Sequence, residues 1–264
     1  MDLGLADRTV LVTGSAGGIG QATARALASA GAKPLLHYHR SEEKARDLAR
    51  ELSAETEKKI AAFGADLRNE SEVDAMFDEI QAHHGKLHGV VANAGIWVRD
   101  EVPLHEMTLA QWNETLDSDL TSAFLTCRGF LRALARHPFE DPSIVLVGST
   151  AGLFGEANHA DYSAAKAAMA HGLTASLKNE IVRLAALGRV NCVCPGWVLT
   201  PMAEQALGDP NALTDATRTV AMNKVATPED IANSILYLSS PTLAGHISGT
   251  ILPVHGGMEG RVLH

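Results

Sequence analysis

The sequence predicts an α/β fold in which helices cover both faces of a doubly wound parallel sheet of about seven strands. Short, continuous apolar runs alternate along the chain with longer segments of helical pattern. Strands buried on both faces have this near-continuous apolar composition, because parallel sheets are covered by helices on each side. The 264 residues contain no linker, repeat or low-complexity segment, so we expect one domain with a sizeable core.

The expected strands are short and mostly apolar. They are RTVLVTG (8–14), KPLLHYH (33–39), KIAAFGAD (59–66), LHGVVANAG (87–95), SIVLVGS (143–149), RVNCVCPG (189–196) and GTILPV (249–254). Pro34 has no amide hydrogen to donate, so the second strand must either begin near it or lie at a less regular edge of the sheet.

Helical segments separate most of these strands. Residues 20–31 are predicted to form a helix that ends at Gly31. Residues 41–55 form a charged amphipathic run whose first residue, Ser41, can cap the helix N-terminus. This alternation of strand and helix is typical of a single doubly wound domain.

Composition and charge limit the classes of function. Hydrophobic residues make up 46% of the chain and charged residues 20%, which is ordinary for a globular protein. The net charge of −9 and the pI near 5.7 argue against a nucleic-acid partner, which would need a basic surface. We find no signal-peptide pattern and no apolar run of membrane-spanning length, so we expect a cytoplasmic protein without a membrane partner.

The three cysteines suit a reducing compartment. Cys192 and Cys194 stand two residues apart in a strand-like run, which is neither a C-x-x-C motif nor the spacing of a metal site. We interpret both as core residues and expect no bound metal.

The segment TGSAGGIG (13–20) lies where the first strand turns into the first helix. Gly14, Gly18 and Gly20 would let the backbone bend tightly and approach a phosphate, and a helix N-terminus offers free N–H groups to an anion. The spacing is G-x-x-x-G-x-G rather than G-x-G-x-x-G. A dinucleotide site and a purely structural turn are both open on this motif alone, and its place after the first strand favours the dinucleotide.

Tyr162 and Lys166 stand four residues apart in the segment YSAAK (162–166), which places both side chains on one face of a helix. In an isolated pair of this kind, the tyrosine is usually a core residue and the lysine a solvated one. A chemical role is the alternative, because a nearby ammonium group favours the ionised form of a phenol.

Seven motifs, taken in order, resemble the short-chain dehydrogenase/reductase family over essentially the whole chain. They are TGSAGGIG at 13–20, AD at 65–66, NAG at 93–95, GS at 148–149, YSAAK at 162–166, PGWVLT at 195–200 and HGG at 255–257. The resemblance implies a single Rossmann-type domain over residues 1–264 that binds NAD(P)(H) and transfers a hydride between the nicotinamide and a carbonyl or secondary alcohol. The sequence looks most similar to the 3-oxoacyl-carrier-protein reductase branch, whose features many sugar, polyol and steroid dehydrogenases share.

The resemblance also implies catalytic roles. Tyr162 would be the general acid in reduction and the base in oxidation, Lys166 would lower its pKa, and Ser149 would hydrogen-bond the substrate oxygen. Family members carry an asparagine where this chain has Asp119, whose carboxylate would oppose the lysine and raise the pKa of Tyr162. A catalytically weak NADP-binding sensor or regulator is the alternative function, and Asp119 is the feature that favours it.

A set of cofactor contacts follows from the same resemblance. The residues are Gly14, Ser15, Gly18, Ile19, Gly20, Arg40, Ser41, Asp66, Leu67, Asn93, Ala94, Gly95, Tyr162, Lys166, Pro195, Val198 and Thr200. Asp66 would bind the adenine amino group, or else cap the helix that begins near Ser71. Residues 93–95 would pass beside the adenosine ribose, stabilise a turn, or do both.

The end of the second strand bears on the choice between the two cofactors. An acid there would bind the ribose 2′-hydroxyl of NAD and repel a 2′-phosphate, but this chain has Tyr38 at that position. Arg40 could pair with the 2′-phosphate of NADP and Ser41 could donate to it. We therefore expect NADP(H) rather than NAD(H), with a solvated loop charge as the other interpretation of Arg40.

The substrate, a carbonyl or alcohol, is less defined. Trp97 and Trp197 follow the NAG and PG motifs, and each could line a broad apolar pocket or belong to the core. His159 would face the pocket mouth without a catalytic role. Residues 197–226 resemble the substrate-covering segment of relatives, and the family's common assembly, a homotetramer, is the one we expect here.

Overall fold

A seven-stranded sheet forms the centre of the protein, for which a computed structural model describes residues 2–98, 100–203, 210–218 and 220–258. The strands are β1 (Thr9–Val12), β2 (Lys33–Tyr38), β3 (Ala62–Gly64), β4 (Gly89–Ala92), β5 (Ser143–Val147), β6 (Arg189–Pro195) and β7 (Ile251–Val254). All neighbouring pairs are parallel, in the order β3-β2-β1-β4-β5-β6-β7. The seven predicted strands and their parallel arrangement are thus confirmed.

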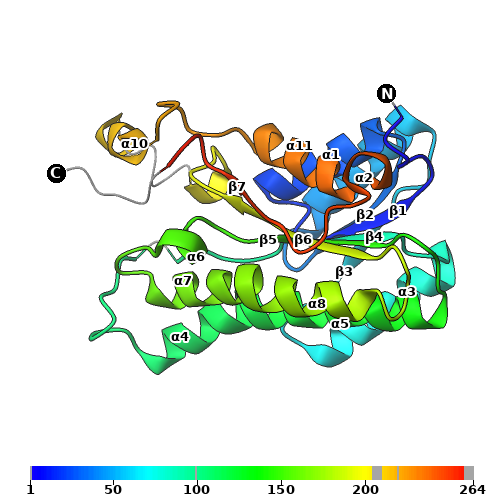
Figure 1. Ribbon diagram of the computed structural model, residues 1–264, viewed down its shortest axis with the longest axis horizontal. Coiled ribbons are helices and arrows are strands. Elements are labelled where there is room, and N and C mark those ends of the chain that lie inside the picture. Colours follow the sequence, from blue (N-terminus) through cyan, green and yellow to red (C-terminus); the bar gives the residue numbers. More distant parts are fainter. Residues whose placement is uncertain (1, 99, 204–209, 219, 259–264) are drawn as a thin grey trace.

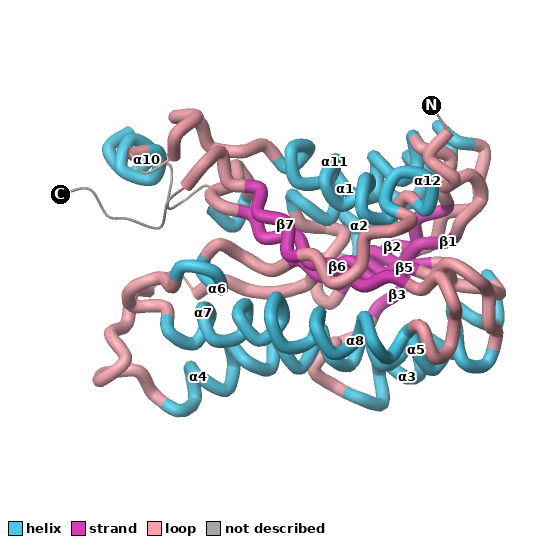
Figure 2. Tube along the Cα trace, in the orientation of Figure 1, coloured by secondary structure: helices cyan, strands magenta, loops and turns pink. Residues whose placement is uncertain are grey.

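Helices cover both faces of the sheet (Figures 1 and 2). One layer contains α1 (Gly18–Ser29), α2 (Glu42–Thr56), α11 (Pro228–Ser239) and α12 (Pro241–Ala244). The other contains α3 (Glu70–His84), α4 (Leu109–Leu116), α5 (Ser122–Arg136), α7 (Ala160–Ala167) and α8 (Thr174–Ile181). Short π-helical turns, η1 (Asp117–Thr121) and η2 (Ala168–Leu173), join α4 to α5 and α7 to α8. The helices α6 (Ala151–Phe154) and α10 (Pro210–Thr217) lie beyond the carboxyl ends of the strands. None of the described helices has the length and apolar character needed to cross a bilayer.

The two largest hydrophobic clusters among the described residues lie on opposite faces of the sheet. Side chains alternate along each strand, so Leu11 packs into one core while Val10 and Val12 pack into the other. Phe130 of α5 and Leu27 of α1 are fully buried, each in the core on its own side. Burial on both faces explains why the strands are apolar throughout instead of alternating with polar residues.

Pro34 is the second residue of β2, which lies inside the sheet between β1 and β3. It is paired with Val10 of β1, while pairing of β2 with β3 begins only at Leu36. The Lys33 amide donates to Arg8 and the Leu36 amide to Ala61, so even-numbered amides of this strand face β3. The missing amide of Pro34 falls before that ladder begins, and the strand-start alternative is the one the structure adopts.

Two predicted helix caps differ in detail from the structure. Ser41 occupies the N-cap position of α2, but its side chain makes no capping hydrogen bond. At α3 the cap is Asn69, whose side chain accepts from the Ser71 amide. Asp66 therefore does not cap α3, because it lies one turn earlier and its carboxylate accepts from Arg68.

His37 links three strands near the carboxyl edge of the sheet. Its Nδ1 accepts from the Gly14 amide at 3.1 Å, and Nε2 lies 3.0 Å from the Ala65 carbonyl. Since Nδ1 accepts, the proton must lie on Nε2, and the ring is neutral when both bonds form. Burial of the imidazole lowers the pKa of His37 from 6.5 to about 4.

This pKa predicts a loss of stability in mild acid. Between pH 6.5 and pH 4 the unfolded chain binds a proton at His37 that the folded chain does not. Stability is therefore fully present above pH 6.5 and falls as the pH approaches 4. At about 1.4 kcal/mol per pKa unit, we expect His37 to remove about 3 kcal/mol of unfolding free energy over this range.

Denaturant titrations of the wild type and His37→Asn across this pH range measure the effect. The variant should be less stable near neutrality, and its stability should fall less on acidification. His84 and His88, whose pKa values burial also lowers, are present in both proteins and cancel in the comparison. Parallel stability curves for the two proteins would contradict the assignment to His37.

Candidate active site

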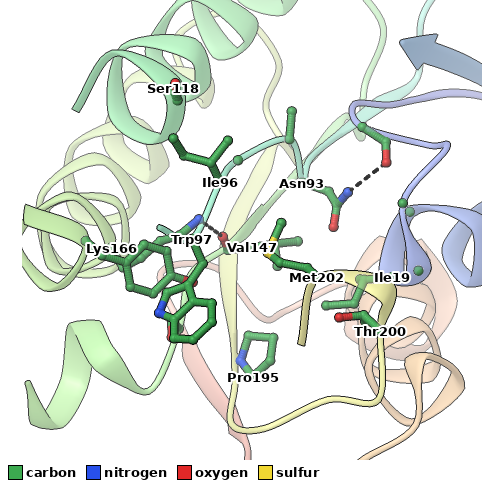
Figure 3. Close-up of a pocket in the computed structure, with 18 of the residues that line it drawn as sticks. Ile19, Asn93, Ile96, Trp97, Ser118, Val147, Lys166, Pro195, Thr200 and Met202 are labelled. Atoms are coloured by element: carbon green, nitrogen blue, oxygen red, sulfur yellow. Dashed lines mark hydrogen bonds between the residues drawn. The ribbon is translucent and has the colours of Figure 1, made fainter. Parts of the chain in front are cut away.

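A cavity of about 770 Å³ opens along the carboxyl ends of the strands. Its walls come from the glycine turn after β1, the ends of β2 and β3, residues 93–97 after β4 and residues 148–151 after β5. The end of β6 and the segment after it contribute residues 195–198 and 200–203. After β1 and β4, which are neighbours in the sheet, the chain turns to opposite layers, so the cavity lies at the switch point of the sheet, where open α/β folds bind ligands. Figure 3 shows part of its lining.

The glycine turn has a structural reason for its composition. Gly14 has a φ of 63°, which favours glycine, and a Cβ at Gly20 would lie 2.3 Å from the Gly14 carbonyl oxygen. Gly17 is the N-cap of α1 and makes no side-chain cap, so the first-turn amides of α1 have no capping side chain beside the cavity. The turn is thus both tightly folded and suited to an anion such as a pyrophosphate.

Thr13 joins the glycine turn to the NAG segment. Its hydroxyl accepts from the amides of Asn93 (2.9 Å) and Ala94 (3.0 Å), and the Asn93 side chain donates to the Thr13 carbonyl (2.9 Å). The turn-stabilising role considered for Asn93 is therefore present, and Asn93, Ala94 and Gly95 also line the cavity. Sequence reasoning did not identify Thr13, whose role depends on the pairing of β1 with β4.

Positive side chains gather where the cavity meets the end of β2. Arg40 and Lys44 are exposed and line the cavity, together with Ser41. Tyr38 also lines the cavity, and its hydroxyl interacts with Glu42 and Arg46 of α2. Arg46, with a smaller contribution from Tyr38, lowers the pKa of the Glu42 carboxylate. The last residue of β2 is thus a tyrosine, and no carboxylate stands at this position to repel a 2′-phosphate.

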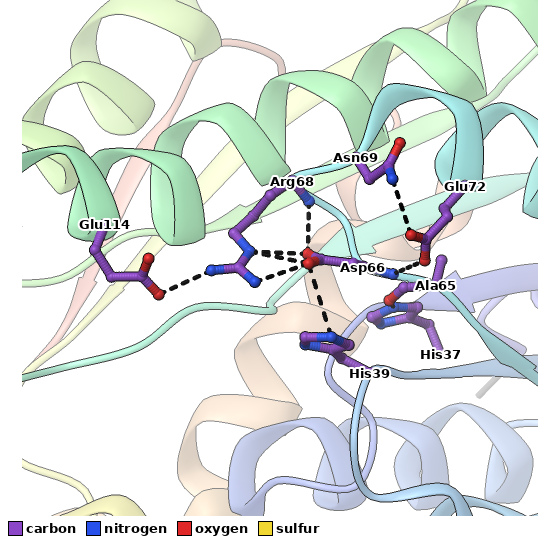
Figure 4. Close-up of polar contacts among 8 residues, drawn as sticks. All are labelled: His37, His39, Ala65, Asp66, Arg68, Asn69, Glu72 and Glu114. Carbon is purple, nitrogen blue, oxygen red and sulfur yellow. Dashed lines mark hydrogen bonds and ion pairs between the residues drawn. The ribbon is translucent and has the colours of Figure 1, made fainter.

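Asp66 is held by an arginine at the same end (Figure 4). Its carboxylate accepts from the Arg68 amide and guanidinium, and Arg68 also donates to Glu114 at 2.8 Å. His39 Nε2 lies 3.8 Å from the same carboxylate. The Arg68 hydrogen bonds lower the pKa of Asp66 to about 2, so Asp66 stays ionised and fixed on the cavity wall.

Tyr162 and Lys166 lie on α7, as the four-residue spacing predicted. Lys166 is only 4% exposed, which rejects the interpretation of a solvated lysine. Its Nζ donates to the Val147 carbonyl at 3.3 Å and lies 5.4 Å from the centre of the Tyr162 ring. Figure 3 shows the bond between Lys166 and Val147. Both Tyr162 and Lys166 line the cavity, as does Ser149 at the end of β5.

Asp119 lies in the π-helical turn η1 and is fully buried. Its Oδ1 lies 3.6 Å from Lys166 Nζ and accepts from the Ile96 amide at 2.9 Å. A Cβ at Gly95 would lie 2.1 Å from this Oδ1, so the absence of a side chain at Gly95 provides the space for the ion pair. Asp119 therefore lies behind the cavity wall, in contact with Lys166.

The electrostatics of this group differ from the sequence expectation. Burial raises the pKa of Tyr162 above its ordinary value; Lys166 and Ser149 oppose the rise, and Asp119 adds to it. Lys166 thus lowers the pKa as expected, but not enough to bring the net value below that of a free tyrosine. Burial favours neutral Lys166, yet Asp119 and Tyr162 outweigh it and raise its pKa, so the ammonium form is retained.

The wall after β6 is an extended segment. Val198 forms a parallel bridge with Ala226, in which the Trp197 carbonyl and the Leu199 amide are the bonded groups. The peptide groups of Val198 itself therefore point away from Ala226. Val198, Thr200 and Pro195 all line the cavity, and Figure 3 shows Thr200 beside Ile19.

Nearly all predicted site residues meet at this one cavity. The lining includes Gly14, Gly18, Ile19, Gly20, Arg40, Ser41, Asp66, Leu67, Asn93, Ala94, Gly95, Ser149, Tyr162, Lys166, Pro195, Val198 and Thr200. Ser15 and Asp119 are not among the lining residues, because Ser15 donates its hydroxyl to the His37 carbonyl and Asp119 lies behind Lys166. Trp97 and Trp197 line the cavity, whereas buried His159 does not. Of the expected covering segment 197–226, residues 204–209 and 219 lie outside the described residues.

Lys44, Arg68 and Glu156 also line the cavity, and the sequence analysis did not select them. Lys44 lies in the first turn of α2, which begins at Glu42, and is four residues after Arg40. Arg68 follows the AD motif by two residues, and its basic side chain beside Asp66 was a usable signal. Nothing in the sequence around Glu156 distinguishes it from a surface acid.

The sequence has curated relatives along nearly its entire length. Residues 14–259 match the profile of the family described as enoyl-(acyl carrier protein) reductase. A cis-4-hydroxycyclohexanecarboxylate dehydrogenase of Sinomonas cyclohexanicum is 38% identical over 96% of each chain. A 3-oxoacyl-[acyl-carrier-protein] reductase of Aquifex aeolicus is 33% identical over 98% of this chain and 100% of its own.

Solved structures of similar fold also match this chain over nearly its whole length. A candidate NAD(P)-dependent gluconate 5-dehydrogenase from Beutenbergia cavernae with bound NADP has a TM-score of 0.88 and 30% identity, over 99% of this chain and 100% of its own. A short-chain dehydrogenase/reductase from Brucella melitensis has a TM-score of 0.87 and 30% identity, over 98% and 99%. This chain belongs to the short-chain dehydrogenase/reductase family, and is an NAD(P)-dependent oxidoreductase that acts on alcohol or carbonyl substrates.

Proposed function

We propose that the protein is an NADP(H)-dependent enzyme that interconverts a ketone and a secondary alcohol, with Tyr162 as the general acid in reduction and the base in oxidation. The observation that carries this proposal is the meeting of Ser149, Tyr162 and Lys166 on one cavity wall, backed by the buried Asp119. This arrangement supports an enzyme over the alternative of a weakly active cofactor sensor. Binding of a cofactor does not require a buried ammonium group beside a phenol, whereas proton transfer by the phenol does.

The side chains divide the chemical task. When bound, the nicotinamide accepts or supplies the hydride. The Tyr162 hydroxyl gives its proton to the carbonyl oxygen in reduction and recovers it in oxidation. Lys166 stabilises the phenolate that remains, and Ser149 donates to the substrate oxygen as negative charge develops on it.

The proposed cofactor contacts follow the cavity from end to end. The N-terminus of α1 would receive the pyrophosphate, Asp66 the adenine amino group, and Val198 and Thr200 the nicotinamide carboxamide. Arg40 and Lys44 supply positive charge where a 2′-phosphate would lie, which supports NADP(H) over NAD(H).

Tyr162→Phe should lower kcat by roughly a hundredfold or more, because it removes a positioned proton donor. Cofactor affinity, measured by the quenching or enhancement of NADPH fluorescence, should change little. Tyr237→Phe on α11 is a matched control, since this tyrosine is 38% exposed and does not line the cavity. Turnover near the wild-type level in Tyr162→Phe would refute the assignment.

Asp119→Asn should shift the pH dependence of oxidation. The Asp119 carboxylate raises the pKa of Tyr162, so its removal should let the phenolate form at lower pH. The pH of half-maximal oxidation should therefore move down, with kcat changed by less than about tenfold, because no proton donor is lost. A shift to higher pH would contradict this account, as would a loss beyond about a hundredfold.

The matched control for that variant is Asp117→Asn. Asp117 belongs to the same π-helical turn but is exposed and accepts from Thr121. Its substitution should leave the pH profile in place, which separates the effect of the buried charge from that of any change in η1.

Arg40→Ala should reduce kcat/KM with NADPH by about tenfold or more, the scale of a lost charge-assisted hydrogen bond. The value with NADH should change by less than about threefold, because NADH has no 2′-phosphate. Arg50→Ala provides the control, since Arg50 lies on α2, the helix that follows Arg40, and outside this cavity. Equal losses with both cofactors would show that Arg40 does not read the phosphate.

For the assembly, we propose a homotetramer. Apolar side chains are exposed on α5 and just after α8, among them Phe124 (44%), Val182 (46%) and Leu187 (52%). A second copy could bury these residues, and D₂ symmetry is a common arrangement for four copies. Light scattering should give the mass of four chains, and a monomer at micromolar concentration would exclude this assembly.

A further inference from the structure

The substrate end of the cavity is a corner built from aromatic rings. Trp97 and Trp197 meet edge to face with ring centroids 5.9 Å apart, and the His159 ring lies 5.2 Å from that of Trp97. Both indoles line the cavity, while the His159 side chain is only 4% exposed. Figure 3 shows Trp97 between Lys166 and Pro195. Faces and edges of indoles suit a compact apolar ring.

Glu156 adds a carboxylate to this corner. It lines the cavity with 28% of its side chain exposed. Its Oε1 lies 3.9 Å from His159 Nε2, and the Trp97 indole N–H donates to the carboxylate. The main chain is fixed as well, because the Glu156 amide donates to the hydroxyl of Ser163, the residue after Tyr162, at 3.0 Å. Glu156 is therefore held in place as an acceptor close to the reacting end.

Glu156 differs from the other acids of the cavity in its ion-pair partner. Asp66 and Glu114 line its opposite end, and both are bound by Arg68. Across the described part of the chain, no lysine or arginine lies within ion-pair distance of Glu156, whose partner is His159. His159 is shielded from the cavity, so a substrate in this corner meets the carboxylate and not the imidazole.

A carboxylate at an apolar wall is stabilised by every further hydrogen-bond donor that it meets. A hydroxyl group on the substrate would supply such a donor, whereas a substrate carboxylate would bring a like charge into a site of low dielectric constant. The corner thus favours one class of ligand and disfavours another by the sign of a single charge.

We propose that Glu156 is a substrate-binding residue that accepts a hydrogen bond from a second hydroxyl group on a neutral cyclic alcohol or ketone. The ring of this substrate packs in the corner between Trp97 and Trp197. The inference rests on the proposed function, in which the reacting oxygen lies at Tyr162 and Ser149. It names the substrate class: hydroxylated ring ketones and their diols, with ring carboxylates excluded.

The test compares three ketones with NADPH: cyclohexanone, 4-hydroxycyclohexanone and 4-oxocyclohexanecarboxylate. The wild type should prefer the hydroxyketone over cyclohexanone by about tenfold in kcat/KM, the scale of one hydrogen bond to a charged group. It should reduce the carboxylate less well than cyclohexanone. In Glu156→Gln the preference for the hydroxyketone over cyclohexanone should fall below about threefold, and kcat/KM for the carboxylate relative to cyclohexanone should rise by about tenfold.

Glu101→Gln is the control, because Glu101 is an exposed acid that binds Asn158 and does not line the cavity. This variant should keep both preferences of the wild type. A wild type that reduces the carboxylate better than the hydroxyketone would overturn the proposal, as would unchanged preferences in Glu156→Gln.

A binding measurement separates this proposal from the proposed function. Tryptophan fluorescence, to which Trp97 and Trp197 contribute, can follow binding of 1,4-cyclohexanediol and of cyclohexanecarboxylate in the presence of NADPH, with which neither ligand reacts. Tighter binding of the diol that Glu156→Gln abolishes would support the acceptor role even if no ketone is reduced, in which case the proposed function alone fails. Equal affinities for the two ligands in the wild type would overturn the acceptor role even if ketones are reduced.

Discussion

The burial of one ammonium group organises the active end of this molecule. Lys166 is almost fully enclosed, and a buried cation is tolerated only when acceptors surround it. Three parts of the chain supply them: the Val147 carbonyl at the end of β5, the Asp119 carboxylate in η1 and the Tyr162 ring on α7 itself. Satisfying one charge therefore fixes a strand, a π-helical turn and a helix relative to one another.

The ion pair between Lys166 and Asp119 explains two further features of the structure. The π-helical turn places Asp119 between α4 and α5, and a local π-helical insertion in a helix often marks a functional position. Gly95 leaves the space into which the Asp119 carboxylate projects. The glycine of the NAG segment is thus required by a side chain that lies 24 residues later (95 to 119) and not by the turn alone.

Local patterns were sufficient to predict the strands, the glycine turn and the placement of Tyr162 beside Lys166, because each depends on a few consecutive residues. Contacts between distant segments were not accessible in this way. The bond from His37 to Gly14 depends on where the ends of β1 and β2 meet. The net pKa of Tyr162 was misjudged for the same reason, since spacing reveals the lysine but not the burial that outweighs it. The Asn69 cap of α3 and the binding of Asp66 by Arg68 each join residues only two positions apart, so the sequence did carry a signal for them.

The charges along the cavity are arranged by sign. Arg40 and Lys44 lie at the nucleotide end, Lys166 is neutralised from behind by Asp119, and Glu156 faces the substrate corner. In the proposed function, this arrangement attracts the phosphates of the cofactor to the end that carries Arg40 and Lys44, because the carboxylate at the other end repels them. In the proposed substrate corner, the same carboxylate would select the substrate through the sign of its charge, and the indoles would select it through shape. Selectivity at the two ends therefore depends on different residues, and a substitution at Glu156 can alter the choice of substrate while leaving the cofactor end intact.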